Sequence, residues 1–270
     1  MRRVNKILMA TVAILLCLVL ISTSVVSGIF AKFIITKTAQ TSMVIEKFGM
    51  RLIVTPDTTN LENAGATVNL TNQNSYKRDV IHVEITNLQM APGDEFFDAL
   101  RVQITGTPNV DIKFRMSCHI DYDTTQYKYN NKSYMPLGFT MRFSETGNLL
   151  DICYPYQENK DNEDIEEIIV RNMYNKIYNK SLSANDPLFK TDSSTDYYYE
   201  TTYVTDTTKD NAWSNAPSNL KDFYLGFDFP DKGRNGNNKD IDRDAIATAL
   251  SENAAGSSIK IIFSFTIEQA

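Results

Sequence analysis

Alternation of apolar and polar side chains is the clearest pattern in this sequence. Across residues 110–122, seven apolar side chains fill every second position, from Val110 to Tyr122, with polar side chains between them. This period of two predicts a strand with one buried and one solvated face. The same alternation occurs at 137–143, 223–229 and 259–267, and shorter strands bounded by turn residues are predicted at 48–54, 67–71, 79–86 and 97–104. Many strands joined by turns predict an all-β fold, an antiparallel jelly-roll-like β-sandwich.

Two segments follow a helical period instead. The apolar side chains that share one face of a helix at 163–179 are Ile165, Ile168, Ile169, Met173 and Ile177. A shorter helix is predicted at 242–251. We expect both to be insertions between strands, so that the sandwich carries one or two inserted helices.

The first 31 residues have the layout of a secretory signal. Basic residues up to Lys6 precede an apolar run at 7–21, and small residues follow as far as Ala31. The alternative is a retained membrane anchor, because no charged residue lies between Lys6 and Lys32. We predict that residues 1–31 are removed as a signal peptide.

The charge balance limits the function classes. The whole chain has 27 Lys and Arg against 33 Asp and Glu. Removing the signal takes away three basic side chains and no acidic ones, so 24 remain against 33 and the mature net charge is −9. Such an acidic chain argues against nucleic acid as a partner. The apolar content of 42% is enough for one domain with a sizeable core, which we place at residues 48–270.

The pattern of apolar side chains at residues 32–47 predicts an extended N-terminal arm. Its apolar side chains on one side, at a period of two, are Phe33, Ile35, Ala39, Met43 and Ile45. Such an arm can pair with its own sheet as a first strand, or with the open edge of a neighbouring molecule. In the second case donor and acceptor are different surfaces, so the contact is head-to-tail and propagates into a filament unless it closes into a ring.

The sequence lacks the H-E-x-x-H metalloprotease motif, the G-x-S-x-G hydrolase motif and the G-x-x-x-x-G-K-S/T phosphate-binding loop. The two histidines, His82 and His119, fall on the polar faces of their predicted strands, so we interpret them as surface residues. We assign no catalytic, cofactor-binding or metal-binding residue. An oxidising compartment would allow Cys118 and Cys153 to pair, and the alternative is two separate buried thiols. The Tyr-rich tract at 192–210 is interpreted as an exposed strand, with a contact patch as the alternative.

Three short stretches carry a family resemblance. They are Ser-Gly-Ile-Phe-Ala-Lys-Phe at 27–33, Asn-Leu-Gln-Met-Ala-Pro-Gly-Asp at 87–94, and Gly-Ser-Ser-Ile-Lys-Ile-Ile-Phe-Ser-Phe at 256–265. In this order they resemble the signal cleavage region, the Pro-Gly-Asp turn and the closing strand of the TasA and camelysin family, the biofilm-matrix proteins of Gram-positive bacteria. By this resemblance, residues 97–106 would form the strand that follows the turn and is the partner of the strand before it.

The resemblance implies a secreted structural protein. It implies that a SipW-type signal peptidase cuts between Ala31 and Lys32, and that the jelly-roll domain assembles into extracellular matrix fibres. The mature N-terminal residues would enter the next subunit as a donor strand, with Phe33, Ile35, Ala39, Met43 and Ile45 as the inserted side chains. The partners would be other copies of the chain and a fibre-anchoring or accessory protein. The alternatives are a metal-dependent protease, as camelysin-like relatives are described, and an anchored monomeric surface-binding module.

Overall fold

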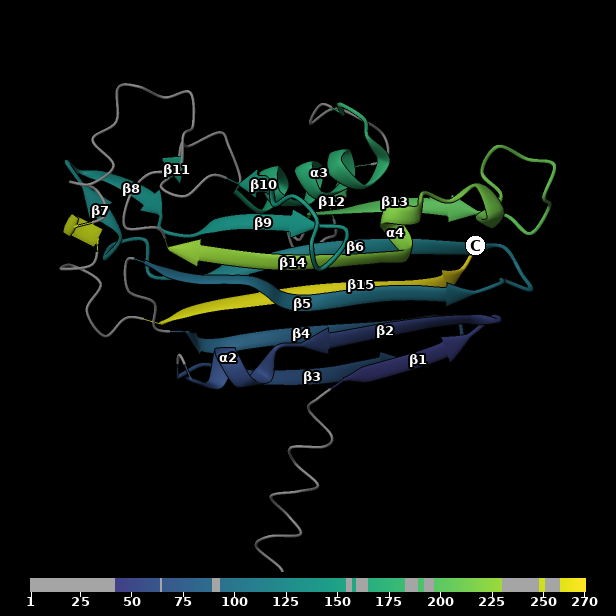
Figure 1. Ribbon diagram of the computed structural model, residues 1–270, viewed down its shortest axis with the longest axis horizontal. Coiled ribbons are helices and arrows are strands. Elements are labelled where there is room, and N and C mark those ends of the chain that lie inside the picture. The colour runs from purple at the N-terminus through teal and green to yellow at the C-terminus, as the bar shows by residue number, and fades with distance from the viewer. Residues whose placement is uncertain are drawn as a thin grey trace, which may run out of the picture. The chain divides into compact units, whose positions relative to one another are not determined.

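Two antiparallel β-sheets make up most of the described chain (Figure 1). The structure is a computed structural model that describes residues 42–63, 65–88, 93–153, 157–158, 165–182, 189–191, 197–229, 248–250 and 258–270. Ser42–Ala270 forms one compact unit. This architecture confirms the predicted all-β, antiparallel jelly-roll-like sandwich with helical insertions.

Each of the two large sheets has six strands within the described residues. In order across the sheet, the first contains β1 (Met43–Lys47), β2 (Met50–Pro56), β5 (Asp94–Gly106), β14 (Asp222–Phe229), β9 (Gly138–Arg142) and β10 (Leu150–Cys153). The second contains β12 (Phe189–Thr191), β13 (Tyr197–Tyr203), β6 (Ile112–Asp121), β15 (Ile259–Gln269), β4 (Arg78–Leu88) and β3 (Thr67–Asn74). A small sheet contains β11 (Gln157–Glu158), β8 (Lys132–Met135) and β7 (Lys128–Tyr129). The helices that the structure describes from end to end are α2 (Thr58–Asn63), α3 (Ile165–Tyr178), α4 (Ser218–Lys221) and the 3₁₀ turn η1 (Trp213–Asn215).

The core lies between the two large sheets because their strands keep the alternation of buried and exposed side chains. Every second residue of β6 from Ile112 to Ile120 is buried, and β15 follows the same pattern. Aromatic rings connect the sheets, since the ring centroids of Phe139 in β9 and Phe263 in β15 are 6.5 Å apart. The strongest sequence pattern therefore marks the central strands.

Helix α3 covers one side of the sandwich. It packs against β10 of the first sheet and against β13 and β6 of the second. Its buried side chains Ile169, Met173 and Ile177 recur every four residues and join the common core. Glu167 in the first turn and Lys176 in the last suit the helix dipole. Of the shorter helix predicted at 242–251, residues 248–250 are described and are helical.

The sandwich begins inside the segment predicted to be the N-terminal arm. β1 pairs with β2 through a turn in which Phe48 has φ of 56° and Gly49 has φ of 77°. Two successive positive φ values are typical of the tight hairpin turns that match strand twist. A Cβ atom on Gly49 would lie 2.3 Å from the Thr107 carbonyl oxygen, so this turn requires glycine. The domain therefore starts at Met43, ahead of the predicted boundary at residue 48.

The connection that contains the Pro-Gly-Asp motif crosses between the sheets. β4 ends at Leu88 in the second sheet, and β5 begins at Asp94 in the first. The strand after the motif is confirmed, but its expected pairing with the strand before the motif is wrong. β5 pairs with β2 and β14, whereas β4 pairs with β3 and β15.

Candidate functional site

The sandwich side away from α3 ends in two edge strands. β1 is an outermost strand of the first sheet and β3 an outermost strand of the second (Figure 1). Lys47 of β1 contacts the second sheet beside the end of β3, because its Nζ donates a hydrogen bond of 2.7 Å to the carbonyl oxygen of Ser75, which follows β3, and lies 3.2 Å from Asp79 Oδ2 of β4. Within the described residues, no strand pairs with the outer side of either one. Their outward backbone groups are placed to pair with a further strand.

β3 lacks the features that usually protect a sheet edge. It is eight residues long, contains neither a charged residue nor proline, and pairs with β4 without a register shift. Thr71, Asn72 and Gln73 are all exposed. Natural edge strands are commonly blocked by charges, proline, bulges or short length. We call β3 the open edge.

The other described edges carry such protection. β1 contains Glu46 and Lys47. β10 is four residues long, with an aspartate and a register shift in its pairing with β9. β12 is three residues long and contains Lys190.

Apolar side chains reach the surface along the two edge strands. Val44 of β1 is 51% exposed. Met43, Phe48 and Leu70 are half-buried and pack against the core. Covering them with another strand would remove apolar area from water, which is favourable.

Residues predicted to form the donor strand fall into two groups. Met43 and Ile45 lie in β1, paired with Val54 and Leu52 of the same chain. The side chain of Ile45 is buried in the core. The predicted cleavage residues Ala31 and Lys32, and the predicted donor residues Phe33, Ile35 and Ala39, lie outside the described residues.

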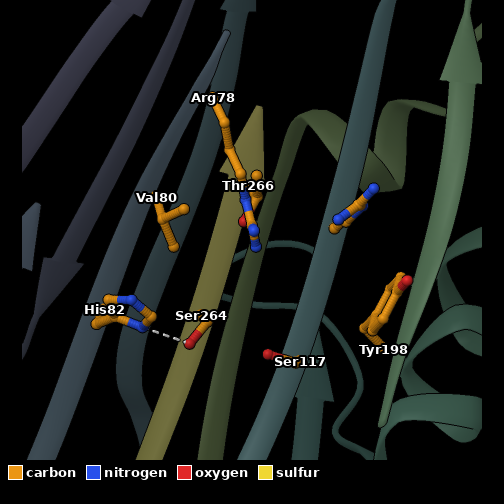
Figure 2. A pocket seen from close by; sticks show the side chains of 8 residues that line it. Arg78, Val80, His82, Ser117, Tyr198, Ser264 and Thr266 are labelled. Atoms are coloured by element: carbon orange, nitrogen blue, oxygen red, sulfur yellow. Dashed lines mark hydrogen bonds between the residues drawn. The ribbon is translucent and has the colours of Figure 1, made fainter. Parts of the chain in front are cut away.

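A polar hollow lies on the outward face of the second sheet (Figure 2). One cross-strand row runs from His82 in β4 through Ser264 in β15 and Ser117 in β6 to Tyr198 in β13. The two short serine side chains lie between larger ones, which leaves a hollow of about 80 Å³. His82 Nδ1 and Ser264 Oγ are hydrogen bonded at 2.6 Å.

Arg115 is the centre of an ion cluster beside this hollow. Its Nε lies 2.5 Å from Glu200 Oε2, and its Nη2 lies 2.7 Å from Glu268 Oε1. Its guanidinium carbon is 5.0 Å from the ring centroid of Tyr198. These contacts fix the guanidinium against the sheet.

The second histidine and the cysteines lie apart from this hollow. His119 Nδ1 is 2.9 Å from Glu166 Oε1 of α3, and both histidines lie on the outward face, as the alternation predicts. Cys118 and Cys153 are buried thiols that form no disulfide with each other. Burial raises the pKa of Cys118 well above its usual value and that of Cys153 to about 12.

The described residues offer neither a metal site nor a membrane span. Among them, no three His, Cys, Asp or Glu side chains gather as a metal site would require. Within the same part of the chain, no helix combines the length and apolar character needed to cross a bilayer. Part of the predicted Tyr-rich tract forms β13, but Tyr199 and Tyr203 are buried against the core, so they form no surface patch.

The sequence alone predicts neither the open edge nor the hollow. The open edge has a signal in the uncharged run Thr-Val-Asn-Leu-Thr-Asn-Gln-Asn, but only the sheet order shows that this strand is outermost. The hollow depends on four strands far apart in sequence. No protein-family model and no curated protein matches this chain.

Proposed function

We propose that this protein is a secreted structural protein that polymerises head-to-tail into extracellular biofilm-matrix fibres. The open edge carries the proposal, because an eight-residue uncharged edge strand favours pairing with another chain. The resemblance of three stretches to the TasA and camelysin family supports it from the sequence. Removal of residues 1–31 by a SipW-type signal peptidase would free the arm at Lys32.

The donor in this proposal is the part of the arm that precedes β1. Residues 32–41 have Phe33, Ile35 and Ala39 on one side, at the period of a strand. An extended strand of this length spans roughly 33 Å, which exceeds the roughly 27 Å of an eight-residue strand. Residues 32–41 are therefore long enough to cover β3 of a neighbour. Met43 and Ile45 would stay in their own sheet and connect donor and domain.

Head-to-tail growth follows from the positions of donor and acceptor. The donor precedes β1 in the first sheet, whereas the acceptor is β3 in the second. Because the two surfaces differ, each subunit can donate to one neighbour and accept from another. Backbone hydrogen bonds would supply affinity, and the alternate apolar side chains would fix register.

A truncation and an add-back experiment test the donor. A chain of residues 42–270 retains β1, so it should fold but form no fibres, whereas the chain of residues 32–270 should form fibres in electron micrographs. A synthetic peptide of residues 32–41 should bind the truncated chain and inhibit assembly of the longer one. Fibres of normal length from the truncated chain would overturn the proposal.

Charge placement tests the acceptor. The double variant Thr71→Lys/Gln73→Lys puts two cations on the open edge and should abolish fibres while the circular dichroism spectrum stays unchanged. The matched control Thr207→Lys/Ser214→Lys adds the same charge at exposed positions outside β3 and should assemble normally. Equal assembly of the two variants would exclude β3 as the acceptor. Mass spectrometry of the secreted chain separately tests whether it starts at Lys32.

A further inference from the structure

We propose that the polar hollow on the outward face of the second sheet binds a tetrahedral oxyanion, such as a phosphate group. Its lining side chains are Arg78, Val80, His82, Arg115, Ser117, Tyr198, Ser264 and Thr266. Apart from Val80, all of them carry polar groups able to donate hydrogen bonds. They come from four neighbouring strands, so the donors surround the hollow from several directions (Figure 2).

The local charge favours an anion although the whole chain is acidic. Arg78, Lys113 and Arg115 lie on this face, and their ion pairs within the described residues go to two carboxylates, Glu200 and Glu268. The cluster of these five side chains therefore has one positive charge in excess. Because both guanidiniums line the hollow and neither carboxylate does, the positive groups are closer to a bound ligand.

Arg78 supplies the most specific indication. Its side chain is 43% exposed, but the Nε atom itself is buried and makes no hydrogen bond within the described part of the chain. The carboxylate oxygen that it faces, Glu268 Oε2, is 3.9 Å away, beyond hydrogen-bond distance. In Figure 2 the Arg78 side chain extends along the face toward Thr266. Buried donors are normally paired, so an anion in the hollow would satisfy this one.

The arrangement favours a tetrahedral anion over a carboxylate. A carboxylate binds arginine best through two parallel hydrogen bonds. On Arg115, Nε and Nη2 already contact Glu200 and Glu268. The Ser117 Oγ and the Arg78 guanidinium each offer separate contacts, and Ser264 Oγ can donate to an anion when His82 Nδ1 is the donor of their mutual hydrogen bond. Oxygens that point in several directions match such donors, and a hollow of about 80 Å³ has room for the five heavy atoms of phosphate.

Equilibrium dialysis of the purified protein with radiolabelled inorganic phosphate tests this inference, and it works for monomers and fibres alike. Arg78→Gln should weaken phosphate binding about tenfold, the usual scale for losing one charge-assisted hydrogen bond. Ser117→Ala/Ser264→Ala should weaken it as well. The matched control Lys260→Gln removes a cation from the same face, where Lys260 pairs with Glu84 at 2.6 Å outside the hollow, and should bind like the unaltered protein.

Competition experiments define the ligand class. Sulfate should displace phosphate, whereas acetate at the same concentration should not. Displacement by glycerol phosphate would identify the source as an esterified phosphoryl group, and failure of this ester to compete would identify it as the free ion. Absence of binding at about 10 mM phosphate, equal weakening by Arg78→Gln and Lys260→Gln, or equal competition by acetate would overturn the inference. Thermal unfolding of each variant verifies that the sheet is intact.

Discussion

Gly226 shows how a single residue sets the geometry of the first sheet. It lies in β14 where the pairing with β5 shifts register between Leu225 and Phe227. A Cβ atom at this position would lie 2.3 Å from the Phe97 carbonyl oxygen. Opposite Gly226, β5 has three residues, 97–99, instead of one, and these two extra residues bring its backbone against β14, as in a β-bulge, so only glycine fits without displacement.

Gly226→Ala should therefore destabilise the protein by about 1–3 kcal/mol, the usual cost of overpacking a well-packed interior. Urea unfolding followed by circular dichroism measures the free energy of unfolding. The exposed control Ser214→Ala should change it by less than about 0.5 kcal/mol. Equal stability of the two variants would show that the sheet accommodates the added methyl group.

The buried thiols lead to a prediction about reactivity and pH. The pKa of Cys153 is raised from 9.0 to about 12 by burial. Near pH 8, iodoacetamide should modify Cys153 at least about a thousandfold more slowly in the folded than in the unfolded protein, because each pKa unit lowers the thiolate fraction tenfold. Mass spectrometry with and without guanidinium measures this ratio. Comparable rates in both conditions would contradict the burial of this thiol.

The same pKa shift makes the stability of the folded protein depend on pH. The folded state keeps the Cys153 proton to a higher pH than the unfolded state does. Its contribution to stability is therefore fully present below about pH 9 and is lost as the pH rises toward 12. Cys153→Ala should reduce the slope of stability against pH in this range.

Single elements differ in how well their local sequence predicts them. α3 lies within the predicted 163–179 because its apolar side chains recur every four residues and its ends carry suitable charges. The sequence does not predict α2, since its six residues bury only Leu61 and leave no periodic pattern. The polar neighbours of Tyr199 and Tyr203 predict an exposed strand, whereas Tyr199 packs against Tyr174 of α3, with ring centroids 4.8 Å apart. The local sequence cannot predict that contact, because the two tyrosines lie in different elements.

The packing of α3 can be tested with one buried and one exposed substitution. Met173→Ala should lower the free energy of unfolding by about 2–5 kcal/mol, because Met173 is fully buried between α3 and the sandwich. Lys176→Ala, on the exposed face of the same helix, should change it by less than about 0.5 kcal/mol. Denaturant titration compares the two. Similar values would mean that α3 contributes little to the stability of the core.

The whole molecule shows where prediction from the sequence reaches its limit. Alternation predicts strands but contains no information on their order within a sheet. It therefore cannot show that the strand at 67–74 is outermost, or that β5 and the preceding strand β4 lie in different sheets. The hollow is unpredictable for the same reason, because Ser117 and Ser264 become neighbours only through pairing of β6 with β15. The period of the arm predicts an extended segment, but not that β1 takes up its last five residues.

Net charge should control the rate of the proposed assembly of residues 32–270. At a net charge of −9, subunits repel one another in dilute salt. Raising the ionic strength from about 0.01 to 0.15 M shortens the Debye length from about 30 to 8 Å, so polymerisation should become faster. Light scattering after dilution into the two buffers measures the rate. Slower assembly at the higher ionic strength would indicate that attraction between opposite charges drives the contact.

The position of β15 has a consequence for the timing of folding. This C-terminal strand pairs with β4 on one side and β6 on the other, so it occupies the middle of the second sheet. Because synthesis proceeds from the N-terminus, β15 emerges from the ribosome after the five other strands of this sheet that the structure describes. The central position of this sheet therefore stays empty until residues 259–269 have been synthesised, so β4 and β6 gain their shared partner only at that point.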